Sequence, residues 1–226
     1  MGLGTIIIYF AILMIIPLWA QSKVKGAYHK YSRIGTSTGM TGYQTARKIL
    51  DDNGLFDVKI KEVKGTLTDH YNPKNKTVNL SSGNFHGASM AAVAVSAHEV
   101  GHAIQDQEDY AFLKFRSTLV PVASFGSSSA IWIILAGILL SIPSLQLVGI
   151  FFMAFAVLFQ LVTLPVEFNA SSRAMDQLVG IGIIQNNEER ETKKVLDAAA
   201  LTYVAAALVA VMELMRFVLI FLGSRD

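Results

Sequence analysis

The chain has 226 residues, of which 52% are hydrophobic and 16% are charged, fewer charges than the roughly 25% of an ordinary soluble domain. Its net charge of +2 is too small to indicate a nucleic-acid partner. The absence of cysteine excludes both a disulfide framework and a thiolate metal site.

The first predicted element is an apolar segment at the N-terminus. Gly4–Ala20 holds seventeen uncharged residues, which is the lower limit for a helix that crosses a bilayer. A cleaved signal peptide that ends at Ala20 is the alternative interpretation. A signal peptide begins with positive charge, however, and no positive side chain precedes this segment. We therefore expect an uncleaved transmembrane anchor.

The polar segment that follows has the pattern of a small α+β unit. Ser22–Met40 is polar and is expected to be a connector. Thr41–Gly54 predicts a helix with a threonine cap at its first residue and a glycine stop at its last. Asp57–Val63 alternates apolar and charged residues, as a strand does. Thr66–Ser81 predicts two strands around the turn Asn72–Asn75.

The next predicted helix carries the most informative motif of the chain. Ala and Val recur at helical spacing after Gly87, and the stretch "SAHEVGHAIQ" follows. His98 and His102 are four residues apart, so a helix places both on one face, where they can bind one metal ion. Glu99 lies beside them and can reach a water on that metal. The alternative is two histidines satisfied within a polar helix face, which the apolar flanking residues disfavour.

A long uncharged segment comes next and predicts a transmembrane hairpin. Ser117–Val166 contains fifty residues without a charge, too many for one span and suited to two. Ser141–Ser144, "SIPS", supplies the break between them. We therefore expect two spans, Val120–Ile142 and Leu145–Val166.

Two histidines leave a zinc site incomplete, because catalytic zinc usually takes three protein ligands and keeps one position open. Without cysteine, the third ligand must be His, Asp or Glu. Glu167 follows the hairpin directly and is the predicted third ligand, which makes a His₂Glu site with His98 and His102. The histidines that remain as alternatives are His29, His70 and His86.

A last apolar segment, Ala198–Leu222, brings the number of predicted spans to four. Within it, Glu213 and Arg216 are three residues apart and can pair. Thirteen of the 19 Lys and Arg residues lie in 21–118 and four lie in 167–196. The positive-inside rule therefore places both of these segments in the cytoplasm and the N-terminus outside.

These observations predict an α-helical multi-pass membrane protein with a small α+β unit. Two spans separate the two cytoplasmic segments, so both must lie on the same side of the membrane. The predicted regions are a transmembrane anchor (1–20), a cytoplasmic segment with the H-E-x-x-H helix (21–118), a transmembrane hairpin (119–166), a cytoplasmic segment with the third metal ligand (167–196), and a fourth transmembrane helix with a short tail (197–226).

Four stretches together resemble one known family over most of the chain. They are "GMTGYQTARKILDDNGL", "LTDHYNPKNKTVNLS", "AVAVSAHEVGHAIQ" and "LPVEFNASSRA". They resemble the YugP-like family of bacterial membrane zinc metallopeptidases. More distantly, the layout is similar to that of HtpX-like and CAAX prenyl proteases, which combine H-E-x-x-H with a later E-x-x-A-D. Glu167 and Ala170 match this second motif, whereas Ser171 stands in place of its Asp.

The resemblance implies a site and a mechanism. It implies a zincin-like, or gluzincin-like, catalytic unit that binds one zinc ion per chain through His98, His102 and Glu167. It implies that zinc activates a water for attack on a peptide bond and that Glu99 is the general base. The groups expected to orient a ligand histidine in place of the missing Asp are Asn169, Asp176 or a water on Ser171. The candidates for a donor to the developing oxyanion are His70, Tyr71 and Arg173.

Two classes of function fit the site and the predicted topology. We expect a metalloendopeptidase in the bacterial inner membrane that cleaves membrane-proximal or misfolded proteins on the cytoplasmic side. Thr77–Leu80, the strand before the metal helix, is expected to offer an edge to an extended substrate or to be an ordinary hairpin strand. A non-enzymatic membrane scaffold or chaperone that retains a metal site is the alternative function. The intact Glu99 favours the enzyme, since a structural zinc site has no use for a general base.

Overall fold

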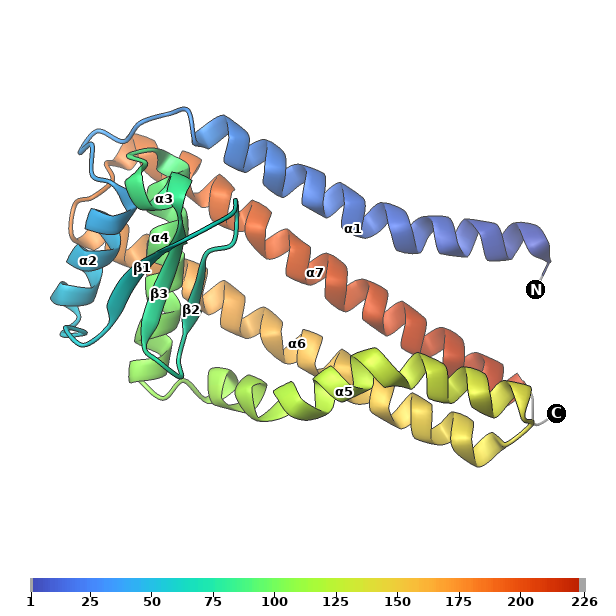
Figure 1. The fold of residues 1–226 in the computed structure, drawn as a ribbon. Coiled ribbons are helices and arrows are strands. Elements are labelled where there is room, and N and C mark those ends of the chain that lie inside the picture. The colour runs from blue at the N-terminus through green and yellow to red at the C-terminus, as the bar shows by residue number, and fades with distance from the viewer. Residues whose placement is uncertain (1, 224–226) are drawn as a thin grey trace. The chain divides into compact units, whose positions relative to one another are not determined.

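The computed structural model describes residues 2–223, which fold as two compact units (Figure 1). The first, here called the membrane unit, consists of residues 2–18, 111–165 and 203–223 of the described chain. The second, here called the sheet unit, consists of Trp19–Tyr110 and Val166–Thr202 and contains the β-sheet. Each unit is therefore assembled from segments that are distant in the sequence.

Among the described residues, four helices are long and apolar enough to cross a membrane. They are α1 (Leu3–Tyr31), α5 (Ala111–Leu139), α6 (Pro143–Gly180) and α7 (Asn186–Gly223). Large apolar side chains on these helices point outward, and Trp132 is 70% exposed. Such a surface suits lipid rather than water. The expected multi-pass helical fold with a small α+β unit is confirmed.

The membrane unit contains the predicted helical hairpin. Helix α5 ends at Leu139, and Ser141 turns the chain with a φ of 56°. Pro143 then begins α6, where its fixed φ and missing N–H cost nothing. Gly126 brings the two helices together, because a Cβ at this position would lie 2.4 Å from the carbonyl oxygen of Phe152. Small residues allow such close backbone approach between helices in a membrane.

The sheet unit begins with the last part of α1, which continues to Tyr31. The expectation of a connector over Ser22–Met40 is therefore wrong for its first half. The segment contains no proline, and two tyrosines attach it to the rest of the unit. Tyr28 donates a hydrogen bond to Asn84, and Tyr31 donates one to Glu191. These tertiary contacts stabilise helix where composition predicts a loop.

Helix α2 (Gly42–Asp52) has the predicted boundaries. The Thr41 side chain accepts from the Gln44 backbone N–H, and the Gln44 side chain accepts from the Thr41 N–H, forming a capping box. Gly54 ends the turn after the helix with a φ of 71°, a conformation that favours glycine. Both signals are local, so the sequence predicts them well.

A three-stranded sheet lies beside the helices of this unit (Figure 1). Its strands are β1 (Lys59–Val63), β2 (His70–Asn72) and β3 (Thr77–Ser81), and their order is β1-β3-β2. Strand β3 pairs parallel with β1 and antiparallel with β2. The expectation that Thr77–Leu80 offers an edge to a substrate is therefore wrong, because β3 is the central strand. The edges of this sheet are β1 and β2.

After β3, the short helix α3 (Ser82–His86) leads into α4 (Met90–Gln107). Ser89 caps α4, because its Oγ accepts a hydrogen bond of 3.2 Å from the backbone N–H of Ala92. Most of α4 is buried, and Val93 and Val100 belong to the hydrophobic core of the sheet unit. The helix that carries the H-E-x-x-H motif is thus held on several sides by packed side chains.

Candidate metal centre

Helix α4 presents two histidines on one face. His98 and His102 are one turn apart, and their ring centroids lie 4.8 Å from each other. This is the arrangement expected from their four-residue spacing. Both side chains are largely buried, with 12% and 11% of the side-chain surface exposed.

A glycine inside the motif allows α6 to approach this face. A Cβ at Gly101 would lie 2.6 Å from the carbonyl oxygen of Ala170 on α6, closer than real Cβ atoms come. Ala170 itself is fully buried. The small residues at both positions bring the backbone of α6 next to α4. Glu167 lies on the same stretch of α6, less than one turn before Ala170.

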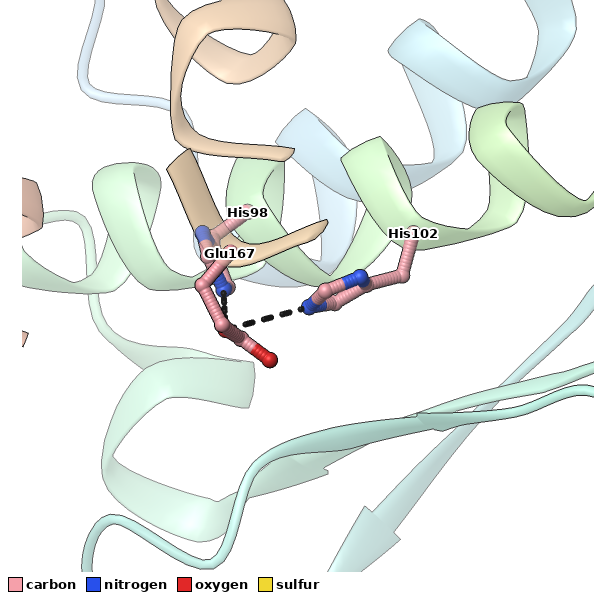
Figure 2. Close-up of side chains that lie close together, drawn as sticks. All are labelled: His98, His102 and Glu167. Atoms are coloured by element: carbon pink, nitrogen blue, oxygen red, sulfur yellow. Dashed lines mark hydrogen bonds and ion pairs between the residues drawn. The ribbon is translucent and has the colours of Figure 1, made fainter. Parts of the chain in front are cut away.

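The close approach brings three side chains together (Figure 2). Glu167 Oε2 lies 3.3 Å from His98 Nε2 and 3.6 Å from His102 Nε2. One potential ligand atom from each of the three residues lies within 4.8 Å of the other two. Sixty-nine residues separate His98 from Glu167 in the sequence, so only the tertiary fold creates this cluster.

The cluster is buried, and the charge of Glu167 acts on the neighbouring histidines. Glu167 is 2% exposed and His102 is 9% exposed. Burial alone would lower the pKa of His102, but hydrogen bonding and charge attraction from Glu167 outweigh it and raise that pKa. The Glu167 carboxylate therefore stabilises positive charge at the rings of His98 and His102. That charge can come from a proton or from a metal cation.

Glu99 lies beside the cluster and is anchored from the sheet. It is 8% exposed, and its Oε2 accepts a hydrogen bond of 2.9 Å from the Tyr71 backbone N–H on β2. Burial raises the pKa of Glu99, although the two neighbouring histidines oppose this effect. The Tyr71 hydroxyl donates to Asp106, and burial together with this bond raises the pKa of Tyr71. Strand β2 thus positions the carboxylate of Glu99.

Each histidine also has a partner at its second ring nitrogen. His98 Nδ1 lies 3.2 Å from Ser171 Oγ, and His102 Nδ1 lies 3.0 Å from Gln105 Oε1. Ser171, which replaces the expected Asp, therefore contacts a histidine of the cluster directly. Gln105 is a partner that the sequence reading missed. Its position three residues after His102, on the same helix face, was the available signal.

The remaining sequence candidates have other partners. Within the described chain, the metal-ligand cluster contains His98, His102 and Glu167 but none of the other three histidines. The contacts of those histidines are His29 with Arg33, His70 with the Thr68 carbonyl and His86 with Glu62. Arg173, a candidate oxyanion donor, forms an ion pair of 2.7 Å with Glu108 and donates to Asn169. Asp176 lines a polar cavity with Arg173.

The chemistry of the cluster suits zinc. Two imidazole nitrogens and one carboxylate oxygen are the ligands of the His₂Glu class of catalytic zinc sites, which leave one position for water. The acceptor groups at the second nitrogens of the histidines are also typical of metal-binding histidines. By the type, number and proximity of the donors, the residues present therefore fit a zinc ion.

Comparisons with known proteins agree with this site. A protein family described as "Putative neutral zinc metallopeptidase" matches residues 6–222, and the chain belongs to this family. The chain is similar to a protein of Bacillus subtilis (strain 168) described as "Putative membrane protease YugP". The two are 54% identical over 211 residues, which cover 93% of this chain and 94% of the other. The comparison with solved structures found no match.

Family membership confirms the expected resemblance to YugP-like proteins and the class of enzyme. The chain is a zinc metallopeptidase of the membrane, with zinc as its cofactor and peptides as its class of substrate.

Proposed function

We propose that His98, His102 and Glu167 bind one zinc ion and that Glu99 is the general base of peptide-bond hydrolysis. The observation that carries this proposal is the cluster itself, with three donor atoms from two separate helices within 4.8 Å of one another. Buried charged side chains are costly unless they are paired or bind a metal. A chain that gathers these three in a buried place supports a metal-binding role for them.

The chemistry divides between the metal and the protein. When bound, zinc lowers the pKa of a coordinated water and polarises the scissile carbonyl. Glu99 takes a proton from the attacking water, whose oxygen forms a bond to the carbonyl carbon. The proton then passes to the amide nitrogen, so the carbon–nitrogen bond breaks into a carboxylic acid and an amine. Tyr71 holds one oxygen of Glu99 through its backbone N–H, and the other oxygen would accept the proton of the water.

We further propose that the site acts on membrane-proximal or misfolded proteins at the cytoplasmic face of the bacterial inner membrane. Residues from both basic segments form the one sheet unit, which supports placing them on the same side. Basic residues are retained in the cytoplasm. Glu167 follows directly on the uncharged segment that ends at Val166, which supports substrates near the membrane surface.

The replacement Glu99→Gln tests the catalytic role. The full chain, purified in detergent or lipid, should keep its zinc and its melting temperature, because Gln has nearly the same shape. Its rate of cleavage of an unfolded polypeptide should fall by about 10²–10⁴-fold, the usual contribution of a general base. Glu62→Gln on β1, at an exposed carboxylate, is the matched control and should cleave like the parent. Parental activity in Glu99→Gln would exclude Glu99 as the base.

The sidedness can be tested without removing any native thiol, because the chain contains no cysteine. Single cysteines at the exposed positions Lys61 and Arg190, the latter two residues after Glu188, should react with a membrane-permeant reagent only, whereas one at the exposed Pro143 should also react with an impermeant reagent added outside. Labelling of Lys61 and Pro143 from the same side would contradict the proposed topology.

A further inference from the structure

Gln105 is a fully buried polar side chain with hydrogen bonds at both ends. Its Nε2 donates to the backbone carbonyl of Val166 at 2.8 Å and to Asn169 Oδ1 at 2.9 Å. Its Oε1 lies 3.0 Å from His102 Nδ1. The amide therefore connects α4 to the turn of α6 that carries Glu167. The proposed roles of the metal ligands and of Glu99 leave this residue without an assigned function.

The surroundings determine which way the amide of Gln105 points. A backbone carbonyl can only accept hydrogen bonds, so the group that faces Val166 must be the NH₂. Asn169 could present either end of its own amide, but Arg173 Nε lies 2.8 Å from Asn169 Oδ1 and can only donate. Arg173 is itself held by an ion pair of 2.7 Å with Glu108. The two groups that face Gln105 Nε2, the Val166 carbonyl and Asn169 Oδ1, are thus both acceptors.

A defined amide orientation has one consequence for His102. Gln105 Oε1 can only accept a hydrogen bond, so His102 Nδ1 must carry the proton that it accepts. His102 Nε2, the atom that faces Glu167, then presents its lone pair when the ring is neutral. This is the form of the imidazole that binds a metal through Nε2.

We propose that Gln105 is a positioning residue that holds His102 with Nδ1 protonated and Nε2 directed to the metal, and that Asn169 couples this orientation to the helical turn of Glu167. The inference rests on the proposed ligation of zinc by His102. It assigns a role to the hydrogen-bonded series Arg173, Asn169 and Gln105, which leads from the partly exposed Arg173 to the buried Gln105 beside His102.

The second ligand histidine provides a comparison inside the same site. Ser171 Oγ lies 3.2 Å from His98 Nδ1, but a hydroxyl can both donate and accept, so it does not select a tautomer. A single hydroxyl also restrains a ring less than a buried amide with three bonds. The loss of Ser171 should therefore weaken zinc binding less than the loss of Gln105.

The decisive experiment compares zinc affinity in variants of the full chain in detergent, measured by competition with a chelator. Gln105→Met keeps the length of the side chain and removes its hydrogen bonds, and it should weaken zinc binding by about 10–100-fold. Gln107→Met is the matched control on an exposed turn of the same helix and should bind zinc like the parent. Asn169→Asp keeps an acceptor for Gln105, so this variant should bind zinc more tightly than Asn169→Leu does.

A spectroscopic readout on the parent chain removes any dependence on the folding of the variants. In zinc-loaded protein with ¹⁵N-labelled histidine, His102 should carry its proton on Nδ1 and bind the metal through Nε2. Metal binding through Nδ1 would overturn the inference, and so would parental zinc affinity in Gln105→Met.

The variant His102→Ala, measured alongside, separates the two levels of the proposal. If His102→Ala binds zinc like the parent, the proposed ligand set is wrong. If it loses zinc while Gln105→Met does not, the ligand set stands and only the positioning role of Gln105 fails.

Discussion

Polar side chains have different surroundings in the two units of this protein. In the sheet unit, Glu99, Gln105 and Glu167 are buried, and each has named partners within the unit. In the membrane unit, the helices approach through glycines and expose large apolar side chains, and Glu213 pairs with Arg216 at the far end of α7. A polar group in a buried place costs free energy unless it is bonded. The difference therefore supports the proposal that the catalytic site lies in the sheet unit.

The comparison also shows how one helix serves both purposes. Helix α6 is uncharged as far as Val166 and then carries Glu167, Asn169 and Ser171 within about one turn. The first part meets the requirements of a bilayer, and the second carries Glu167 of the proposed metal centre. Within the sheet unit, helical backbone hydrogen bonds hold this part of α6, so Glu167 is positioned by a helix and not by a loop.

The largest expected effect separates carboxylates in the two units. The loss of a residue that hydrogen-bonds a metal ligand typically reduces metal affinity by roughly 10–100-fold. Glu167→Ala removes a proposed ligand itself, so it should reduce zinc affinity by more than this. Glu213→Ala, in the membrane unit, should leave zinc affinity unchanged. Metal content after dialysis measures both. One zinc per chain persisting in Glu167→Ala would exclude Glu167 and return attention to the other histidines.

A pair of glycine replacements sharpens the comparison at similar steric cost. Gly101→Ala and Gly126→Ala would each force a Cβ against a helix backbone, at 2.6 Å and 2.4 Å from a carbonyl oxygen. Such overpacking typically costs about 1–3 kcal/mol of stability. Both variants should unfold at lower temperature, but only Gly101→Ala should weaken zinc binding, because it displaces the part of α6 that carries Glu167. Equal zinc affinities in the two variants would show that α6 can move without disturbing the site.

The smallest expected effect concerns a buried carboxylate outside the metal centre. Glu188 accepts hydrogen bonds from the Ser37 N–H at 2.6 Å, the Ser37 hydroxyl at 2.9 Å and the Gln185 N–H at 2.8 Å. Glu188→Gln removes the charge from these bonds and should destabilise the protein by about 1–2 kcal/mol. Thermal unfolding measures the change, with Glu189→Gln, at the neighbouring and only partly buried carboxylate, as control. The zinc content of the folded protein should not change. A loss of zinc in Glu188→Gln would show that Glu188 supports the site as well.

Several features follow from the sequence because their causes are local. The four spans depend on hydrophobic length, and the hairpin turn depends on Pro143 and its neighbours. The start of α2 depends on Thr41 and Gln44, which lie three residues apart. The spacing of His98 and His102 depends only on the pitch of a helix. Each of these features is determined within a few residues or one continuous run, so reading along the chain finds it.

Other features depend on contacts between distant segments. The central place of β3 arises from its pairing with both β1 and β2, and the continuation of α1 to Tyr31 arises from contacts with Asn84 and Glu191. Hydrogen-bond pairing of strands is not encoded in the pattern of any single strand. The sequence indicated Glu167 as the third ligand, but its approach to His98 requires Gly101 and Ala170 to meet.

The partners of His98 and His102 show what the sequence does not predict. The sequence predicts that Ser171 acts on a histidine through a water, whereas the structure shows a direct contact, and the sequence predicts no role for Gln105. Their contacts with His98 and His102 depend on side-chain orientation and on the acceptors that α6 presents. The sequence by itself determined the spans, the metal-binding motif and the class of the enzyme. The tertiary structure decided which side chains orient the site, because hydrogen-bond geometry arises only when separate helices are packed together.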